Sequence, residues 1–288
     1  MEQYDLTVKS VFLDDVVRQS LDSGILINAN MLRKGVEKKK RSWPQFKTSG
    51  YPDISRISGD ELIEKISDSY DRVNMTNTIV VTRSNKRANL YNEGIRSKIL
   101  WKEEDITKGD MLMVVRNNYF WAQEEPELDF IANGDIAEIA DIQDYQERYG
   151  FRFADVMLRF PDYRDIELDV KILLDTISSE SPSLGYEENR QLYFSILEDY
   201  PDIKSKKKKY ELVREHAFFN ALQVKFAYAI TCHKAQGGQW DTVFVDQGYM
   251  KEEMIDTEYY RWLYTAVTRA TSRLYLVNFG DQLFADGD

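Results

Sequence analysis

The stretch AYAITCHKAQGGQWDTVFVD, residues 227–246, places a polar run between two apolar runs. Both apolar runs predict buried strands, because they are short and rich in β-branched and aromatic side chains. In a parallel sheet, the carboxyl ends of the strands open onto a crevice where ligands bind. We therefore expect Thr231, His233 and Lys234 at such a strand end. The two glycines that follow would let the backbone turn or approach a neighbour closely.

The composition is that of a soluble globular protein: 288 residues, 43% hydrophobic and 30% charged. The single cysteine, Cys232, excludes an intramolecular disulfide, and two histidines are too few for a histidine-rich metal site. We predict no metal site in this chain. A net charge of −11 argues against coating nucleic acid through bulk electrostatics, but it leaves a local groove possible. The basic runs at 34–41 and 204–209 predict solvated helix ends or loops.

Membrane association is not expected. No apolar run is long enough to span a bilayer, and the first residues lack the basic-then-apolar pattern of an export leader. Together with the single cysteine, this favours a cytoplasmic protein without a membrane partner.

The order of elements predicts an α/β fold with a parallel sheet that an inserted region interrupts. Strands are expected at 11–19, 78–82, 226–231, 242–246 and 273–279, and helices at 21–35, 62–73, 83–99, 232–236 and 258–271. Gly35 should close the first helix, and Asp60 should cap the second. Short strand-like pieces between 109 and 175 predict a small antiparallel barrel or sheet.

These patterns divide the chain into three parts. Residues 1–108 would form the first part of the sheet domain, 109–216 the inserted barrel with a helical region, and 217–288 the second part. The helical region, 186–216, contains no chemical motif.

The polar run also resembles a known motif. Its T-x-H-K-x-Q-G pattern, starting at Thr231, resembles motif V of superfamily 1 helicases of the RecD-like branch, which lies between two strands of the second RecA-like domain. The segment YYRWLYTAVTRATSRLYLV, 259–277, resembles motif VI of the same family and places Arg269 on a helix. Arginine suits this role because its planar, permanently charged fork stabilises charge on a transferring phosphoryl group.

Two further segments match in the order that the family requires. VFLDDVVRQSLDSGILINA resembles the motif IV region and contributes Arg18, whereas TIVVTRSNKRAN resembles the next strand-to-helix segment. There, Ser84 or Asn85 would cap a helix whose start holds a DNA phosphate. The family also carries a small Src-homology-3-like barrel in this domain, which agrees with the expected insertion.

The resemblance implies a role for each candidate residue. Arg18 and Arg269 would contact the γ-phosphate of ATP as catalytic arginine fingers. The residues expected to face the nucleotide or the coupling path are Gln236, Gly237, Gly238 and Gln239. The residues expected to grip the phosphates of single-stranded DNA are Thr82, Arg83, Ser84, Asn85, Thr231, His233 and Lys234.

The resemblance covers the second motor domain of such a helicase. The phosphate loop GxxxxGK[ST] is not found in this sequence, so ATP and Mg²⁺ would be bound mainly by an upstream RecA-like domain of the same protein. We therefore expect a carboxyl-terminal fragment that is inactive as an ATPase alone. In full-length form it would be a DNA helicase of repair or recombination, resembling the α subunit of exodeoxyribonuclease V, with single-stranded DNA and a nuclease subunit as candidate partners.

Two alternatives remain open on the sequence. Pro161-Asp162 followed by Asp169 and Lys171 fits the PD-(D/E)xK pattern of nucleases, in which carboxylates hold Mg²⁺ and a lysine polarises the attacking water. Pro-Asp is also what a turn between two strands requires. The other alternative is a non-catalytic module that binds nucleic acid or protein and keeps the helicase motifs only as parts of its fold.

Overall fold

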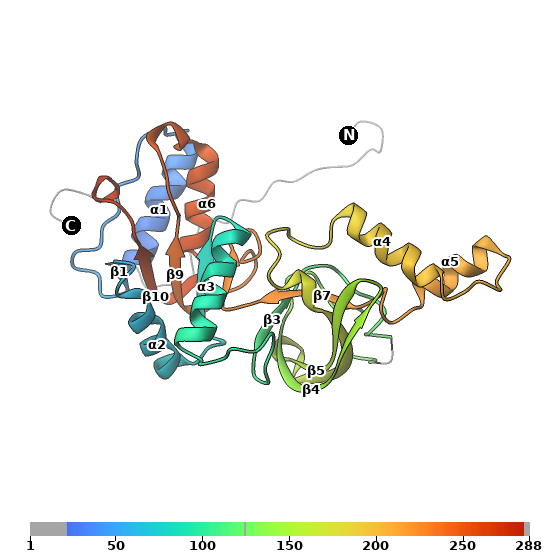
Figure 1. Cartoon of the computed structure of the whole chain (residues 1–288). Coiled ribbons are helices and arrows are strands. Elements are labelled where there is room, and N and C mark those ends of the chain that lie inside the picture. The colour runs from blue at the N-terminus through green and yellow to red at the C-terminus, as the bar shows by residue number, and fades with distance from the viewer. Residues whose placement is uncertain (1–21, 124, 285–288) are drawn as a thin grey trace.

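The computed structural model describes residues 22–123 and 125–284. Its ribbon has two bodies: a parallel sheet flanked by helices, and a barrel that carries a helical arm (Figure 1). This arrangement confirms the predicted fold class, a RecA-like parallel sheet with an inserted small barrel. Arg18 and the strand expected at 11–19 lie outside the described residues.

The sheet has five parallel strands in the order β1-β10-β9-β2-β8. Their bounds are β1 Ile54–Ile57, β2 Thr78–Thr82, β8 Ala229–Thr231, β9 Trp240–Asp246 and β10 Ala270–Val277. All five residues of β2 are buried, as its β-branched sequence TIVVT predicts. In this order β2 lies beside β8, so the end of TIVVT meets the start of the polar run.

Four helices flank the sheet: α1 Gly24–Glu37, α2 Leu62–Val73, α3 Asn85–Lys98 and α6 Thr257–Val267. Helices α1 and α6 lie side by side (Figure 1). Gly35 does not close α1, which continues to Glu37. Tyr260 of α6 instead packs directly on Gly35, where a Cβ would lie 2.2 Å from Tyr260 Cε1. Nor does Asp60 cap α2; Glu61 is the cap residue, and its carboxylate instead accepts hydrogen bonds from the amide and hydroxyl of Ser58.

The insertion is a closed five-stranded barrel of β3 Met111–Val114, β4 Ile136–Arg148, β5 Phe151–Phe160, β6 Ile166–Leu173 and β7 Leu222–Phe226. Neighbouring strands are antiparallel except β6 and β7, whose parallel pairing closes the barrel. The barrel therefore extends to Phe226, beyond the expected boundary at 216. The single strand expected at 226–231 is divided: β7 belongs to the barrel, and β8 to the sheet.

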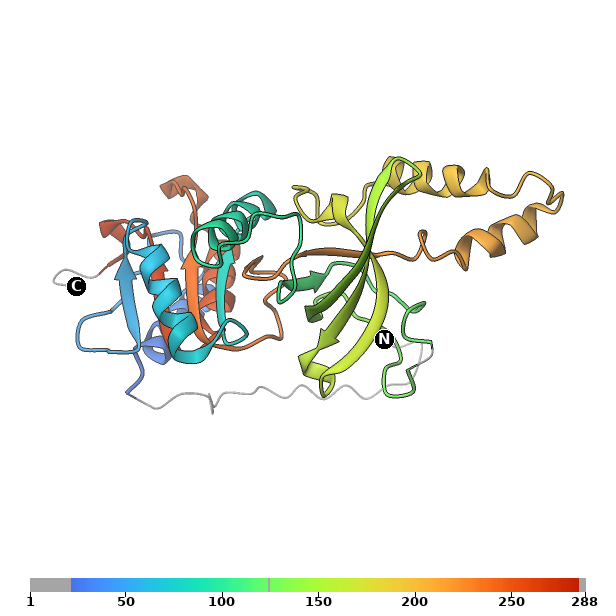
Figure 2. The ribbon, with the colours of Figure 1, turned by 60° about the horizontal axis from the view of Figure 1, so that its bottom comes forward.

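A helical arm lies between β6 and β7. It consists of α4 Tyr186–Leu197 and α5 Lys206–Arg214, and it projects from the barrel on the side away from the sheet (Figure 2). A small apolar core that includes Phe153, Leu192 and Val213 joins the arm to the barrel. Short 3-10 turns complete the described secondary structure at Pro161–Tyr163, Leu174–Thr176, Glu252–Met254 and Asp281–Leu283. Within the described residues, each helix is too short or too polar to cross a bilayer.

Candidate functional site

Two segments far apart in the sequence meet at the carboxyl ends of β2 and β8. Thr82 pairs in register with Thr231, and the amide of Cys232 donates to the carbonyl of Thr82 over 2.9 Å. The parallel pairing thus brings the start of α3 beside the polar run that follows β8. This juxtaposition matches the expectation that both segments face one ligand.

The meeting point is a cavity of about 470 Å³, which we call the α3 cavity. Its lining contains six of the seven residues predicted to contact nucleic acid. The lining residues are Arg83, Ser84, Asn85, Lys86, Glu180, Pro182, Thr231, His233 and Lys234. Three basic side chains therefore face one carboxylate, which gives a local positive site on a chain of net charge −11.

The seventh predicted residue, Thr82, was expected to contact the phosphates of single-stranded DNA, but the structure places it elsewhere. Its side chain is fully buried, and its hydroxyl donates to the carbonyl of Ser84 over 3.1 Å. Thr82 therefore positions the start of α3 and does not touch the cavity. Ser84 is the cap residue of α3, as predicted, because its hydroxyl accepts from the amide of Arg87 over 3.3 Å.

The cations of the α3 cavity are held by different neighbours. The guanidinium of Arg83 lies 5.8 Å from the ring centre of Trp262, and it also contacts the sulfur of Met250. The Nζ of Lys86 lies 3.5 Å from the carboxylate of Glu180. Lys234 donates to the side-chain oxygen of Asn133 on the barrel, and burial lowers the pKa of its amine.

One wall of the cavity was not predicted from the sequence. The segment 177–185, which links the barrel to the arm, lies along α3. The side-chain amide of Asn85 donates to the carbonyl of Glu180 over 3.1 Å, and that of Asn89 donates to the carbonyls of Ser178 and Ser179. One turn further, Asn92 bonds the backbone of Ala229 in β8. These three asparagines recur at helical spacing, and this polar stripe was the available signal that α3 binds other backbone.

The polar run itself is a series of turns and not the short helix expected at 232–236. The amide of Ala235 reaches the carbonyl of Thr231, but the next bonds are of the tighter i to i−3 kind. Each glycine has a separate reason. Gly237 has a φ of +89°, a left-handed conformation that side chains disfavour. At Gly238 a Cβ would lie 2.3 Å from the ring of Trp240.

Arg269 lies just after α6 and not on it, because Thr268 is the cap residue at the carboxyl end of that helix. Its guanidinium donates to the carbonyl of Thr265 over 3.0 Å, to the carbonyl of Gly238 over 2.9 Å and to the hydroxyl of Thr268 over 3.2 Å. The amide of Trp240 in turn donates to the carbonyl of Arg269. The segment expected to be motif VI is thus bound directly to the loop expected to be motif V.

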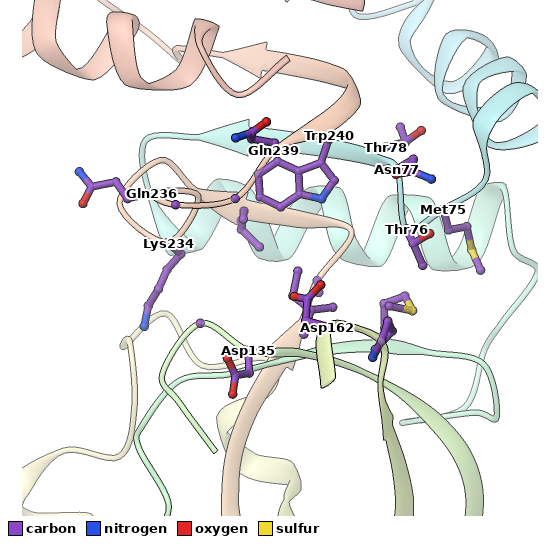
Figure 3. Close-up of a pocket in the computed structure, with 18 of the residues that line it drawn as sticks. Met75, Thr76, Asn77, Thr78, Asp135, Asp162, Lys234, Gln236, Gln239 and Trp240 are labelled. Carbon is purple, nitrogen blue, oxygen red and sulfur yellow. The ribbon is translucent and has the colours of Figure 1, made fainter. Parts of the chain in front are cut away.

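The residues predicted to face the nucleotide or the coupling path line a second, larger cavity of about 950 Å³ between the sheet and the barrel, which we call the loop cavity. Gln236, Gly237, Gly238 and Gln239 all contribute to it. Figure 3 shows Trp240 beside the loop and Lys234 pointing from the loop toward the barrel. His233 and Lys234 line both cavities, so they form the ridge between them.

The nuclease alternative does not fit this geometry. The amine of Lys171 is bound by the carboxylate of Asp155 over 2.5 Å, and Asp169 accepts from Gln143 over 2.6 Å. Asp162 lies in the 3-10 turn beyond the end of β5. No group of three potential metal ligands occurs within 22–123 and 125–284. The residues of the PD-(D/E)xK pattern are therefore not assembled into a site.

Residues 226–277 match the model of the UvrD-like helicase C-terminal domain. No curated protein matches the chain. Among solved structures, the Pif1 helicase from Bacteroides in complex with ADP-AlF3 and single-stranded DNA is 13% identical, with a TM-score of 0.45 over 94% of this chain and 52% of that one. The Pif1 helicase from Candida albicans is 14% identical, with a TM-score of 0.37 over 94% and 56%.

This chain thus spans about half the length of these two helicases. Structural similarity at such TM-scores does not by itself identify a function. The matched segment, in contrast, contains both the loop after β8 and Arg269. It confirms the resemblance to superfamily 1 helicases, while the RecD-like branch stays a prediction: residues 226–277 of this chain are similar to the UvrD-like helicase C-terminal domain.

Proposed function

We propose that this chain is the second motor domain of an ATP-dependent DNA helicase of the RecD-like branch, and that the α3 cavity holds phosphates of single-stranded DNA. The observation that carries this proposal is the convergence of Arg83, Lys86 and Lys234 at the amino end of α3. The first amides of a helix lack partners within the helix and point toward a bound anion, and the helix dipole adds partial positive charge.

The nucleotide would bind on the other side of the polar run. In this proposal an upstream domain supplies the phosphate loop and most of the Mg²⁺ and ATP contacts, and Arg269 completes the site from this chain. Gln239 and its neighbours in the loop cavity would lie along the path between ATP and DNA. Arg18, outside the described residues, keeps its proposed role as a second γ-phosphate contact.

The two sites would be coupled through one short loop. Arg269 binds the carbonyl of Gly238 at one end of it, and Lys234 lines the α3 cavity at the other. Closure of the two motor domains on ATP would shift Arg269 and, with it, the residues that grip the strand. Repeated closure and opening would move the protein along the strand.

The phosphate contact can be tested on the chain alone by measuring binding of fluorescent oligo-dT as a function of salt. Lys86→Gln and Lys234→Gln should each weaken binding several-fold and reduce the slope of log K against log salt by about 0.7, the value for one lost phosphate contact on a single strand. Lys98→Gln is the matched control, because Lys98 is an exposed lysine at the opposite end of the same helix. Equal affinities and slopes for the wild type and all three variants would contradict the proposal.

A further inference from the structure

A third cavity, of about 820 Å³, lies between the barrel loop 116–123 and helix α5 of the arm; we call it the arm cavity. Its lining combines two arginines with four aromatic rings: Arg116, Arg214, Tyr119, Phe120, Tyr210 and Phe219. Most of the remaining lining residues are asparagines and glutamines, and Glu215 is the one carboxylate among the described lining residues. Neither the sequence patterns nor the helicase match assigns a role to this cavity.

Two of the four aromatic rings of this cavity are exposed to a ligand. Tyr119 is 60% exposed and Tyr210 is 48% exposed. Tyr119 stacks on Phe130, with ring centres 5.0 Å apart and planes at 27°, so that one of its faces is supported from behind. Rings held in this way form platforms on which nucleobases stack, and such stacking tolerates any base because every base has a flat π face.

The arginines supply the matching charge. Arg214 lies with its guanidinium 5.6 Å from the ring centre of Tyr210, and Arg116 donates to the side chain of Asn189 over 3.2 Å. Both keep donors for a phosphate, since a guanidinium carries five N–H groups. On a chain of net charge −11, this local excess of cations with exposed rings favours a polyanion that carries flat bases.

The arm cavity and the α3 cavity are neighbours along the linker 177–185. Pro182 lines the α3 cavity. Two residues later, the amide of Leu184 donates to the side chain of Gln223 over 2.9 Å, and Gln223 lines the arm cavity. Single-stranded DNA that leaves one cavity therefore needs to cross only this short stretch of linker to reach the other.

We infer that the arm cavity is a second subsite for the same single strand, with bases stacked on Tyr119 and Tyr210 and phosphates paired with Arg116 and Arg214. This inference rests on the proposed function, because it concerns the strand held in the α3 cavity. Short oligonucleotides occupy the α3 cavity alone, whereas longer ones reach both cavities and bind more tightly.

The test is the length dependence of binding to the full chain. Wild type is titrated with oligo-dT of about 6 and about 16 nucleotides, lengths that bracket typical single-strand sites. In Tyr119→Leu, affinity for the long oligonucleotide should fall about tenfold, the order of magnitude for one lost stacked base. In the double variant Arg116→Gln/Arg214→Gln it should fall several-fold, because two phosphate contacts are lost. Affinity for the short one should be unchanged. Arg190→Gln is the control, because Arg190 is an exposed arginine of the same arm that does not line the cavity.

A long oligonucleotide of abasic sites separates stacking from charge. Tyr119→Leu should not affect its binding, whereas the double arginine variant should weaken it. Equal losses at both lengths, or no loss at either, would overturn the subsite. Competition for binding by a polyglutamate peptide of equal charge, as strong as competition by oligo-dT, would also overturn the subsite. If instead the short oligonucleotide fails to bind wild type, or Lys234→Gln does not weaken its binding, the proposed function of the α3 cavity fails, and this result differs from the length pattern that overturns the second subsite alone.

Discussion

The guanidinium of Arg269 donates a hydrogen bond to the main-chain carbonyl of Gly238 across 2.9 Å. This bond joins the segment after α6 to the loop whose opposite end, His233 and Lys234, faces the α3 cavity. In the proposed function, a displacement of Arg269 would reach the residues that hold the DNA strand through a loop of only a few residues.

We predict that Arg269→Lys, in the protein joined to its upstream domain, lowers the rate of ATP hydrolysis by about a thousandfold or more, the order of magnitude for an arginine finger. Lysine keeps the charge but lacks the planar fork that can hold Gly238 and a phosphate together. Binding of oligo-dT should stay within about twofold, since Arg269 does not line the α3 cavity.

Two outcomes would contradict this view. Unchanged hydrolysis in the variant would remove Arg269 from the nucleotide site and favour a non-catalytic module. Measurable ATP hydrolysis by wild type without an upstream domain would show that the phosphate loop is not needed from elsewhere.

Glu180→Gln should strengthen binding of oligo-dT by about two- to fivefold, the effect of freeing a cation from a weak exposed ion pair. In the structure the carboxylate of Glu180 lies 3.5 Å from Lys86, where it competes with a phosphate for the amine. Glu187→Gln is the control, because Glu187 pairs with Arg190 on α4 outside the cavity. Unchanged or weaker binding of the Glu180 variant would show that the carboxylate does not compete.

Asp110→Asn should destabilise the chain by about 3–5 kcal/mol at pH 7, the cost of removing one partner from a buried ion pair. Asp110 is fully buried, and it binds Arg96 over 3.1 Å and Lys102 over 3.0 Å. Urea unfolding measures the loss. Asp105→Asn, which removes an exposed pair with Arg152, should cost less than about 1 kcal/mol.

The same carboxylate predicts a pH dependence. Burial alone would raise the pKa of Asp110, but hydrogen bonds from Tyr228, Lys102 and the amide of Thr107 lower it below the ordinary value. The folded state then binds its proton less readily than the unfolded state. The stabilisation is complete above about pH 4, near the pKa of an unfolded aspartate, and is lost as pH falls through the folded value. Wild type should therefore lose stability in acid more steeply than Asp110→Asn; parallel curves would refute this assignment.

Two helix glycines should respond in opposite directions to substitution by alanine. Gly35→Ala should destabilise by about 1–3 kcal/mol, because its Cβ would overlap Tyr260 where α1 and α6 pack. Gly94→Ala, in the middle of α3 with no atom within 4 Å of the new Cβ, should stabilise by about 0.5–1 kcal/mol. Thermal melting of both variants checks the pair, and a stabilised Gly35 variant would mean that α6 can move away.

Local patterns in the sequence were enough to predict much of the sheet and its ligand-facing end. The run TIVVT predicted a strand buried on both faces, and Ser84 predicted the start of α3, because both depend on neighbouring residues only. The polar run between apolar runs predicted the strand end where the α3 cavity lies. These features are set by β-branched side chains, by capping and by the way parallel strands end at one edge.

Tertiary structure decided which distant segments complete the site. The linker 177–185 forms a wall of the α3 cavity because asparagines of α3 bind its carbonyls, and nothing within the linker itself encodes that contact. The run FAYAIT reads as one strand, yet Phe226 belongs to a strand of the barrel and Ala229 to a strand of the parallel sheet. Thr82 is buried and Arg269 lies beside Gly238 for the same reason: the partners that fix these side chains are far away in the chain. Sequence alone predicted the candidate site residues, whereas packing between the sheet, the barrel and the arm determined which of them lie together.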